Sequence, residues 1–121
     1  MAVIAKEHLS GVADGLGIKI GATTAGSAGT TIHQAQSGTT AGLFDEIYIY
    51  ATNTNTSAET VTIQFGGHTN PDNHIVSVVQ PNETLLVVPG LILQNSKTVT
   101  AISTTTNKVI LHGFVNRISA S

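Results

Sequence analysis

The 121-residue chain contains no cysteine and no tryptophan, and aromatic residues make up only 4% of it. Without cysteine, disulfide bonds, zinc–thiolate centres and thiol nucleophiles are excluded, and a small secreted scaffold held by disulfides is not expected. The shortage of aromatic side chains leaves little material for a sugar-binding platform. These absences remove several classes of small secreted, redox and carbohydrate-binding protein from consideration.

Positive charge is also scarce, because five Lys and Arg stand against seven Asp and Glu, for a formal net charge of −2. Recognition of nucleic acid or of an anionic membrane surface requires clustered basic side chains. The basic residues here are scattered at Lys6, Lys19, Lys97, Lys108 and Arg117. We therefore expect neither nucleic acid nor a membrane as a partner.

Long apolar runs are missing as well, so no segment is expected to span a bilayer. Residues 1–8 lack the charged segment and apolar block of a signal peptide, and we expect no export by that route. Charged residues make up only 10% of the chain, whereas hydrophobic residues make up 40%. This balance opposes disorder and is enough for one domain with a core of its own.

Residues 43–118 consist of short runs with alternating apolar and polar side chains, separated by turn residues. The clearest is the alternation of Val61, Ile63 and Phe65 with polar neighbours, which is typical of a half-buried strand. Pro89-Gly90 is expected to interrupt the chain between two apolar strands. Seven or more short strands at this spacing predict an all-β, antiparallel sandwich or barrel. The expected strands are 47–52, 60–65, 75–79, 85–88, 91–93, 97–103 and 109–118.

Residues 1–42 differ in composition from the rest of the chain, because they are rich in Gly, Ala, Ser and Thr. Interior glycines disfavour a long helix, so we expect only a short helical turn over Val3–Leu9. Short strands are expected over Leu16–Ile20 and Thr30–Gln34, the second with His33 and Ile32 on opposite faces. We therefore divide the chain into an extended N-terminal arm, 1–42, and a sandwich domain, 43–121.

No catalytic constellation is recognisable, and we predict that the chain is not an enzyme. The stretch Ala25–Gly29 lacks the strand–turn–helix context of a nucleophile elbow. Asp45 and Glu46 are adjacent on a predicted strand, so they point to opposite faces and cannot act as a facing acid–base pair. They are expected to be charges at the start of a strand.

Two further clusters contain residue types that can bind ligands. His68, Asp72 and His74 are metal-type ligands within seven residues, but their spacing matches no metal motif. We favour a polar turn and predict no metal and no cofactor. Tyr48 and Tyr50 share a strand face, either to pack within the domain or to form a platform for a sugar or a protein partner.

Four stretches, 46–53, 60–67, 85–93 and 109–118, carry a pattern of strand ends and corners. It consists of an Asn-rich turn, a Gly-Gly strand end, a Val-Pro-Gly-Leu corner and a terminal Gly-Phe-Val-Asn-Arg strand. This pattern resembles small virion structural proteins of tailed bacteriophages, of the capsid decoration (cement) type. The resemblance implies a β-sandwich, jelly-roll or immunoglobulin-like, and a place on the outer surface of the capsid after synthesis in the host cytoplasm.

On this resemblance the expected partner is the major capsid protein, bound by a homo-oligomer. A trimer is favoured and a dimer stays open. The apolar residues of the arm are the expected contacts, either with the capsid or with a neighbouring protomer: Val3, Ile4, Leu9, Val12, Leu16, Ile18 and Ile20. The alternatives are a neck, tail or head-fibre component of the virion and a carbohydrate-binding β-sandwich module.

Overall fold

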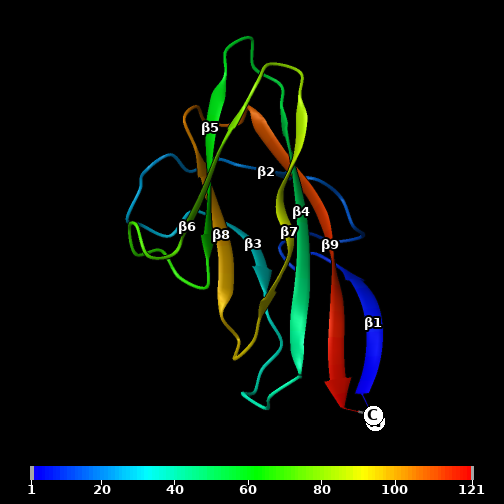
Figure 1. Ribbon diagram of the computed structural model, residues 1–121. Helices are drawn as coiled ribbons and strands as arrows, with labels where there is room; N and C mark the ends of the chain where they lie inside the picture. The colour runs from blue at the N-terminus through cyan, green and yellow to red at the C-terminus, as the bar shows by residue number, and fades with distance from the viewer. Residues whose placement is uncertain (1, 121) are drawn as a thin grey trace.

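The computed structural model describes residues 2–120, which form nine β-strands and no helix (Figure 1). Accordingly, this part of the chain offers no helix that could cross a membrane. The strands are β1 (Ala2–His8), β2 (Ile18–Lys19), β3 (Thr30–Gln34), β4 (Phe44–Asn53), β5 (Glu59–Phe65), β6 (His74–Val79), β7 (Thr84–Leu93), β8 (Thr98–Ser103) and β9 (Val109–Ala120).

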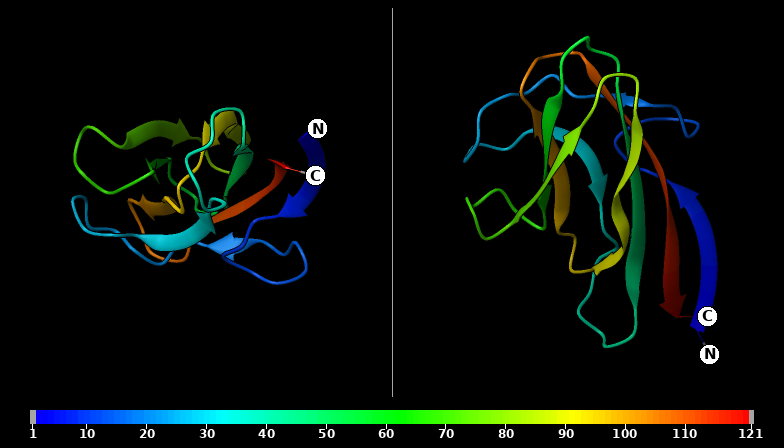
Figure 2. Two further views of the ribbon diagram at one scale, coloured as in Figure 1. Left: turned by 90° about the horizontal axis from the view of Figure 1, so that it is seen from below. Right: turned by 45° about the horizontal axis from the view of Figure 1, so that its top comes forward.

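The strands form two antiparallel sheets that pack face to face as a β-sandwich (Figures 1 and 2). The five-stranded sheet has the order β1-β9-β4-β7, with β2 also paired to β9, and the four-stranded sheet has the order β3-β8-β5-β6. The predicted all-β, antiparallel sandwich is confirmed. Ala2 and Ala120 are cross-strand partners, so both ends of the described chain lie at one corner of the molecule.

The core lies between the sheets and follows the alternation seen in the sequence. Every second residue of β4, from Asp45 to Asn53, is buried, because successive side chains of a strand point to opposite faces. The fully buried positions include Ile47, Ile49 and Ala51 of β4, Val61 and Ile63 of β5, and Val109, Leu111 and Val115 of β9. The predicted inward faces of these three strands are therefore confirmed. The prediction that β5 is half-buried is wrong, because Thr62 and Gln64 on its other face are also buried.

Residues before position 43 are paired into both sheets. β1 and β2 pair with β9, and β3 pairs with β8, so the predicted division at residue 42 coincides with no break in strand pairing. The helical turn expected over Val3–Leu9 is wrong. Residues 2–8 instead pair with β9 without interruption, in keeping with the preference of β-branched Val3 and Ile4 for strands.

The interruption expected at Pro89-Gly90 is also wrong, because β7 continues through both residues. Proline is tolerated there because β7 is the terminal strand of its sheet and its register with β4 shifts beside Pro89. Gly90 has φ +88°, and a Cβ on it would lie 2.9 Å from the ring of Tyr48. The expected burial of 85–88 on both faces fails at Leu86, which is 40% exposed.

The loop before β3 covers the part of the outward face of the four-stranded sheet that lies around Gln64. Gln64 lies on the polar side of β5 yet is fully buried, because its side chain holds this loop. Its Oε1 accepts the N–H of Gly29 at 2.8 Å, and its Nε2 donates to the carbonyl of Ser27 at 2.8 Å. The hydroxyl of Thr100 also donates to Oε1.

Candidate functional site

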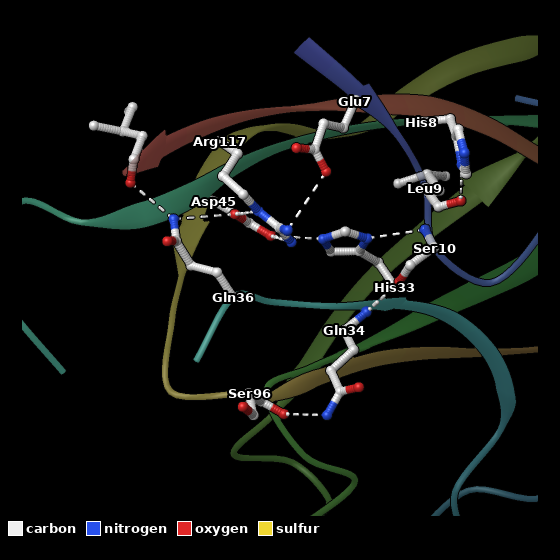
Figure 3. Close-up of polar contacts among 11 residues, drawn as sticks. Glu7, His8, Leu9, Ser10, His33, Gln34, Gln36, Asp45, Ser96 and Arg117 are labelled. Atoms are coloured by element: carbon white, nitrogen blue, oxygen red, sulfur yellow. Dashed lines mark hydrogen bonds and ion pairs between the residues drawn. The ribbon is translucent and has the colours of Figure 1, made fainter. Parts of the chain in front are cut away.

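Three polar side chains meet inside one end of the sandwich, from three different strands (Figure 3). Asp45 of β4 is fully buried and His33 of β3 is 1% exposed. Arg117 of β9 is the cross-strand partner of Asp45. Because β3 belongs to one sheet and β4 and β9 belong to the other, this cluster joins the two layers.

The Asp45 carboxylate accepts four hydrogen bonds. Arg117 forms two of them, from Nε to Oδ1 at 2.8 Å and from Nη2 to Oδ2 at 2.9 Å. His33 Nε2 donates to Oδ2 at 2.8 Å, and Gln36 Nε2 donates to Oδ1 at 3.3 Å. A buried carboxylate is tolerated only when it is paired and hydrogen-bonded in this way.

His33 extends the cluster toward the end of β1. Its Nδ1 accepts the backbone N–H of Ser10 at 3.0 Å, which places the proton of the neutral ring on Nε2, facing Asp45. Gln36 donates a second hydrogen bond, to the carbonyl of Ile118 at 2.8 Å. The cluster therefore ties four segments of the chain together.

A register shift between Thr31 and His33 brings His33 into the interior. Such a bulge lets two successive residues face the same side, and Ile32 and His33 are both buried. The alternation predicted for Thr30–Gln34, with these two residues on opposite faces, is therefore wrong. The burial of Asp45 is indicated by the sequence, because Asp45 lies two residues before the inward-facing Ile47 and alternate residues of a strand point to the same face.

The electrostatics of the cluster favour the ionised carboxylate. Burial alone would raise the pKa of Asp45, but the hydrogen bonds and positive charge of Arg117, with the hydrogen bond of His33, outweigh it, so this pKa is lowered. The hydrogen bond to Asp45 raises the pKa of Arg117. Glu7 of β1 adds a more exposed ion pair, 3.4 Å from Arg117 Nη1.

Ser10, His33 and Asp45 are adjacent without forming a nucleophile triad. The backbone N–H of Ser10 faces the imidazole, whereas its Oγ accepts the N–H of Gln34 at 2.8 Å. A triad requires a hydrogen bond between the nucleophile's oxygen and the imidazole, with access for substrate. What this arrangement can do is cross-link the two sheets.

Buried polar groups also organise turns at another part of the sandwich. Glu59 is 1% exposed, and its carboxylate accepts Asn55 Nδ2 at 2.9 Å and the N–H of Thr105 at 2.8 Å. Burial alone would raise the pKa of Glu59, but these hydrogen bonds outweigh it and the pKa is lowered. Asn53, also fully buried, donates to the carbonyls of Ser57 and Val79, each at 2.9 Å.

His68, in the loop between β5 and β6, and His74 do not converge with Asp72. His68 Nδ1 donates to the carbonyl of Gly26 at 3.1 Å, whereas His74 begins β6 with its Nε2 buried and unpartnered. Within residues 2–120, no three His, Cys, Asp or Glu side chains are grouped so that they could hold a metal ion.

Tyr48 and Tyr50 lie on the outward side of the five-stranded sheet. The Tyr48 ring stacks on Phe114 with centroids 4.8 Å apart, and Lys6 Nζ lies 4.7 Å from the centre of the Phe114 ring. The Tyr48 hydroxyl donates to Glu46 at 3.1 Å, and this hydrogen bond raises the pKa of Tyr48. Tyr48 is thus packed between Phe114 and Gly90, and only Tyr50 is exposed, at 38%.

Several large apolar side chains are exposed on this same side, which we call the outer sheet face. They are Ile4, Tyr50, Leu86 and Ile92, from strands β1, β4 and β7, with exposed fractions of 71%, 38%, 40% and 54%. Next to Ile92 lies a hollow of about 340 Å³. It is lined by Phe44, Ile92, Leu93, Gln94, Asn95 and Lys97.

The seven apolar residues predicted as contacts fall into two groups. Leu9, Ile18 and Ile20 are buried in the core of the sandwich, and Val12 packs partly buried against it. These side chains stabilise the chain's own fold and are not available to a partner. The other three are exposed, Val3 at 44%, Ile4 at 71% and Leu16 at 62%.

Comparison with protein-family models and with curated proteins finds no match for this chain.

Arg117→Met removes the bidentate partner of Asp45 and leaves its buried carboxylate without an opposite charge and without two of its four hydrogen bonds. We expect the free energy of unfolding, measured by urea titration at pH 7, to fall by about 3 kcal/mol. Glu7→Gln, which removes only the exposed ion pair, is the matched control and should cost less than about 1 kcal/mol. Equal losses in the two variants would contradict the role given to the buried pair.

Acid should weaken the fold through Asp45. Because its folded pKa is lowered, the carboxylate contributes stability that is complete above its unfolded pKa of about 3.9. That contribution is lost as the pH falls through the folded pKa. Asp45→Asn should therefore lose less stability than the wild type between pH 5 and the acid transition, measured by urea titration at each pH.

Asp72→Asn removes an exposed carboxylate that joins no ion pair of residues 2–120. It should keep the wild-type acid response. An unchanged response in Asp45→Asn would contradict the assignment.

Proposed function

We propose that this chain is a capsid decoration (cement) protein of a tailed bacteriophage. It binds the outer surface of the assembled head and stabilises it, with the major capsid protein as its partner. It reaches that place in the virion after synthesis in the host cytoplasm. The sandwich is of the jelly-roll or immunoglobulin-like kind, and its N-terminal segment contributes to attachment.

The observation that carries this proposal is the outer sheet face. Single exposed apolar residues are ordinary on a protein surface, but several on one face are typical of a protein–protein contact. Ile4, Tyr50, Leu86 and Ile92 project from three strands of one sheet. We place this face against the capsid, with the hollow beside Ile92 receiving an apolar side chain of the shell.

The buried polar clusters support the same function. A decoration protein has to keep its shape while it holds neighbouring capsid subunits together, and no chemical step is required of it. The hydrogen bonds of Asp45 join the two sheets, and those of Glu59 fix two turns. Many copies of a rigid body on one shell strengthen attachment by avidity.

Fewer apolar residues of the N-terminal segment are available for contact than the sequence predicts, because four of the seven are buried or partly buried. Val3, Ile4 and Leu16 are exposed and remain candidates for contact with the capsid. Of these, Ile4 belongs to the outer sheet face, because it pairs with Ile118 of β9, which in turn pairs with Phe44 of β4.

A carbohydrate-binding module is less well supported. A sugar platform needs exposed aromatic faces, whereas Tyr48 is packed between Phe114 and Gly90. That leaves Tyr50 as the exposed aromatic ring of the pair.

The test is the number of copies in purified virions of the phage that encodes the chain, measured by gel densitometry against the major capsid protein. We expect a ratio between one to one and one to a few, because a decoration protein covers the shell. A ratio below a few per cent would contradict the proposal and favour a neck, tail or head-fibre component. Absence from the particles would remove a virion role and favour the carbohydrate-binding alternative.

A further inference from the structure

Apart from the two-residue β2, which pairs only with β9, the described sandwich has four terminal strands. Three of them carry features that oppose pairing with another chain. Charged residues, prolines and bulges are the usual protections of a sheet edge. β1 carries Lys6 and Glu7, and β7 contains Pro89 and two register shifts. β3 has a register shift and is covered by the segment after β1, through a hydrogen bond of 2.8 Å from Gly11 N–H to the Ile32 carbonyl.

β6 has none of these protections. Its sequence, His-Ile-Val-Ser-Val-Val, contains no Lys, Arg, Asp, Glu, Pro or Gly. It pairs with β5 over six consecutive residues without a register shift, and it is the terminal strand of the four-stranded sheet (Figure 1). Val76 and Val78 project outward from it and are 59% and 54% exposed. An apolar edge of this kind, without charge and without a register shift, is a template for strand pairing.

We propose that β6 pairs with β6 of a second copy of this chain, antiparallel and across a twofold axis. The register is centred on Ser77, which lies opposite Ser77 of the second copy. Val76 then faces Val78 of the other strand, and Val78 faces Val76. The two four-stranded sheets join into one continuous sheet.

The strand's own pattern identifies a second copy as the partner. A twofold interface requires one surface to be complementary to itself, and valines two residues apart on either side of Ser77 meet this condition in an antiparallel pair. The four exposed valines of the two copies pack against one another in two cross-strand pairs, and no charged residue of β6 is brought against its like. The pairing ends at Val79, because the carbonyl of Val79 already accepts a hydrogen bond from Asn53.

This inference does not depend on the proposed function, because it concerns the purified protein alone. It favours a dimer over the trimer expected from the sequence. A dimer with the outer sheet faces uncovered can still bind a capsid, since β6 belongs to the opposite sheet.

Cross-linking tests the register, because the chain has no cysteine of its own. Directly opposite residues of antiparallel strands have Cβ atoms about 4.5–5.5 Å apart, near the spacing of a disulfide. Ser77→Cys should therefore form a covalent dimer on mild oxidation. Val76→Cys alone should cross-link at least tenfold less, whereas an equimolar mixture of Val76→Cys and Val78→Cys should form a heterodimer.

Sedimentation equilibrium gives a second, independent readout. The wild type should be a dimer, and Val76→Lys should raise the dissociation constant at least tenfold. Ile92→Lys is the matched control, because Ile92 is an apolar residue exposed to a similar extent, 54% against 59% for Val76, but lies on the other sheet. It should leave the dimer intact. A monomeric or trimeric wild type would overturn the proposal, as would equal cross-linking of Ser77→Cys and Val76→Cys.

Discussion

A buried carboxylate sets the strictest requirement in this structure. Asp45 has no contact with solvent, and an ionised carboxylate in such a place is very costly unless hydrogen bonds replace its water. Arg117, His33 and Gln36 supply those bonds. Since they come from β9, β3 and the segment after β3, satisfying one side chain fixes how the two sheets meet at this end.

The same requirement shapes the parts of the chain that lack regular structure. Glu59 and Asn53 bond the turns around them, and Gln64 holds the glycine-rich loop against the four-stranded sheet. A chain with few charges and no disulfides thus obtains defined loops from a small number of buried polar groups. The apolar side chains left outside the core, on the outer sheet face and on β6, are then presented on a rigid support, which suits a protein that acts by contact.

Periodicity made the core strands predictable, because alternation places Ile47, Ile49 and Val61 inside regardless of the fold's details. The tertiary contacts were not predictable in this way. His33 enters the interior through a bulge, Gln64 is buried by a loop distant in sequence, and residues 2–8 become a strand only because β9 pairs with them. The burial of Asp45 and Glu59 was predictable from the sequence, since each lies an even number of residues from the buried apolar residues of its strand. Exposure of Tyr50 and Leu86 depends on which face a second sheet covers, and single-strand patterns do not contain that information.

The central claim, that the outer sheet face lies against a capsid, is tested most directly by photo-cross-linking of intact virions. A lysine-directed reagent with a photoreactive arm reports which part of the molecule lies nearest the shell. Lys6 lies over Phe114 on the outer sheet face, Lys97 lines the hollow, and Lys108 lies past the opposite end of β8. Our account predicts links from Lys6 and Lys97 to the major capsid protein, with Lys108 unlinked to it. Links to the capsid from Lys108 alone, or links from Lys6 only to neck or tail proteins, would contradict it.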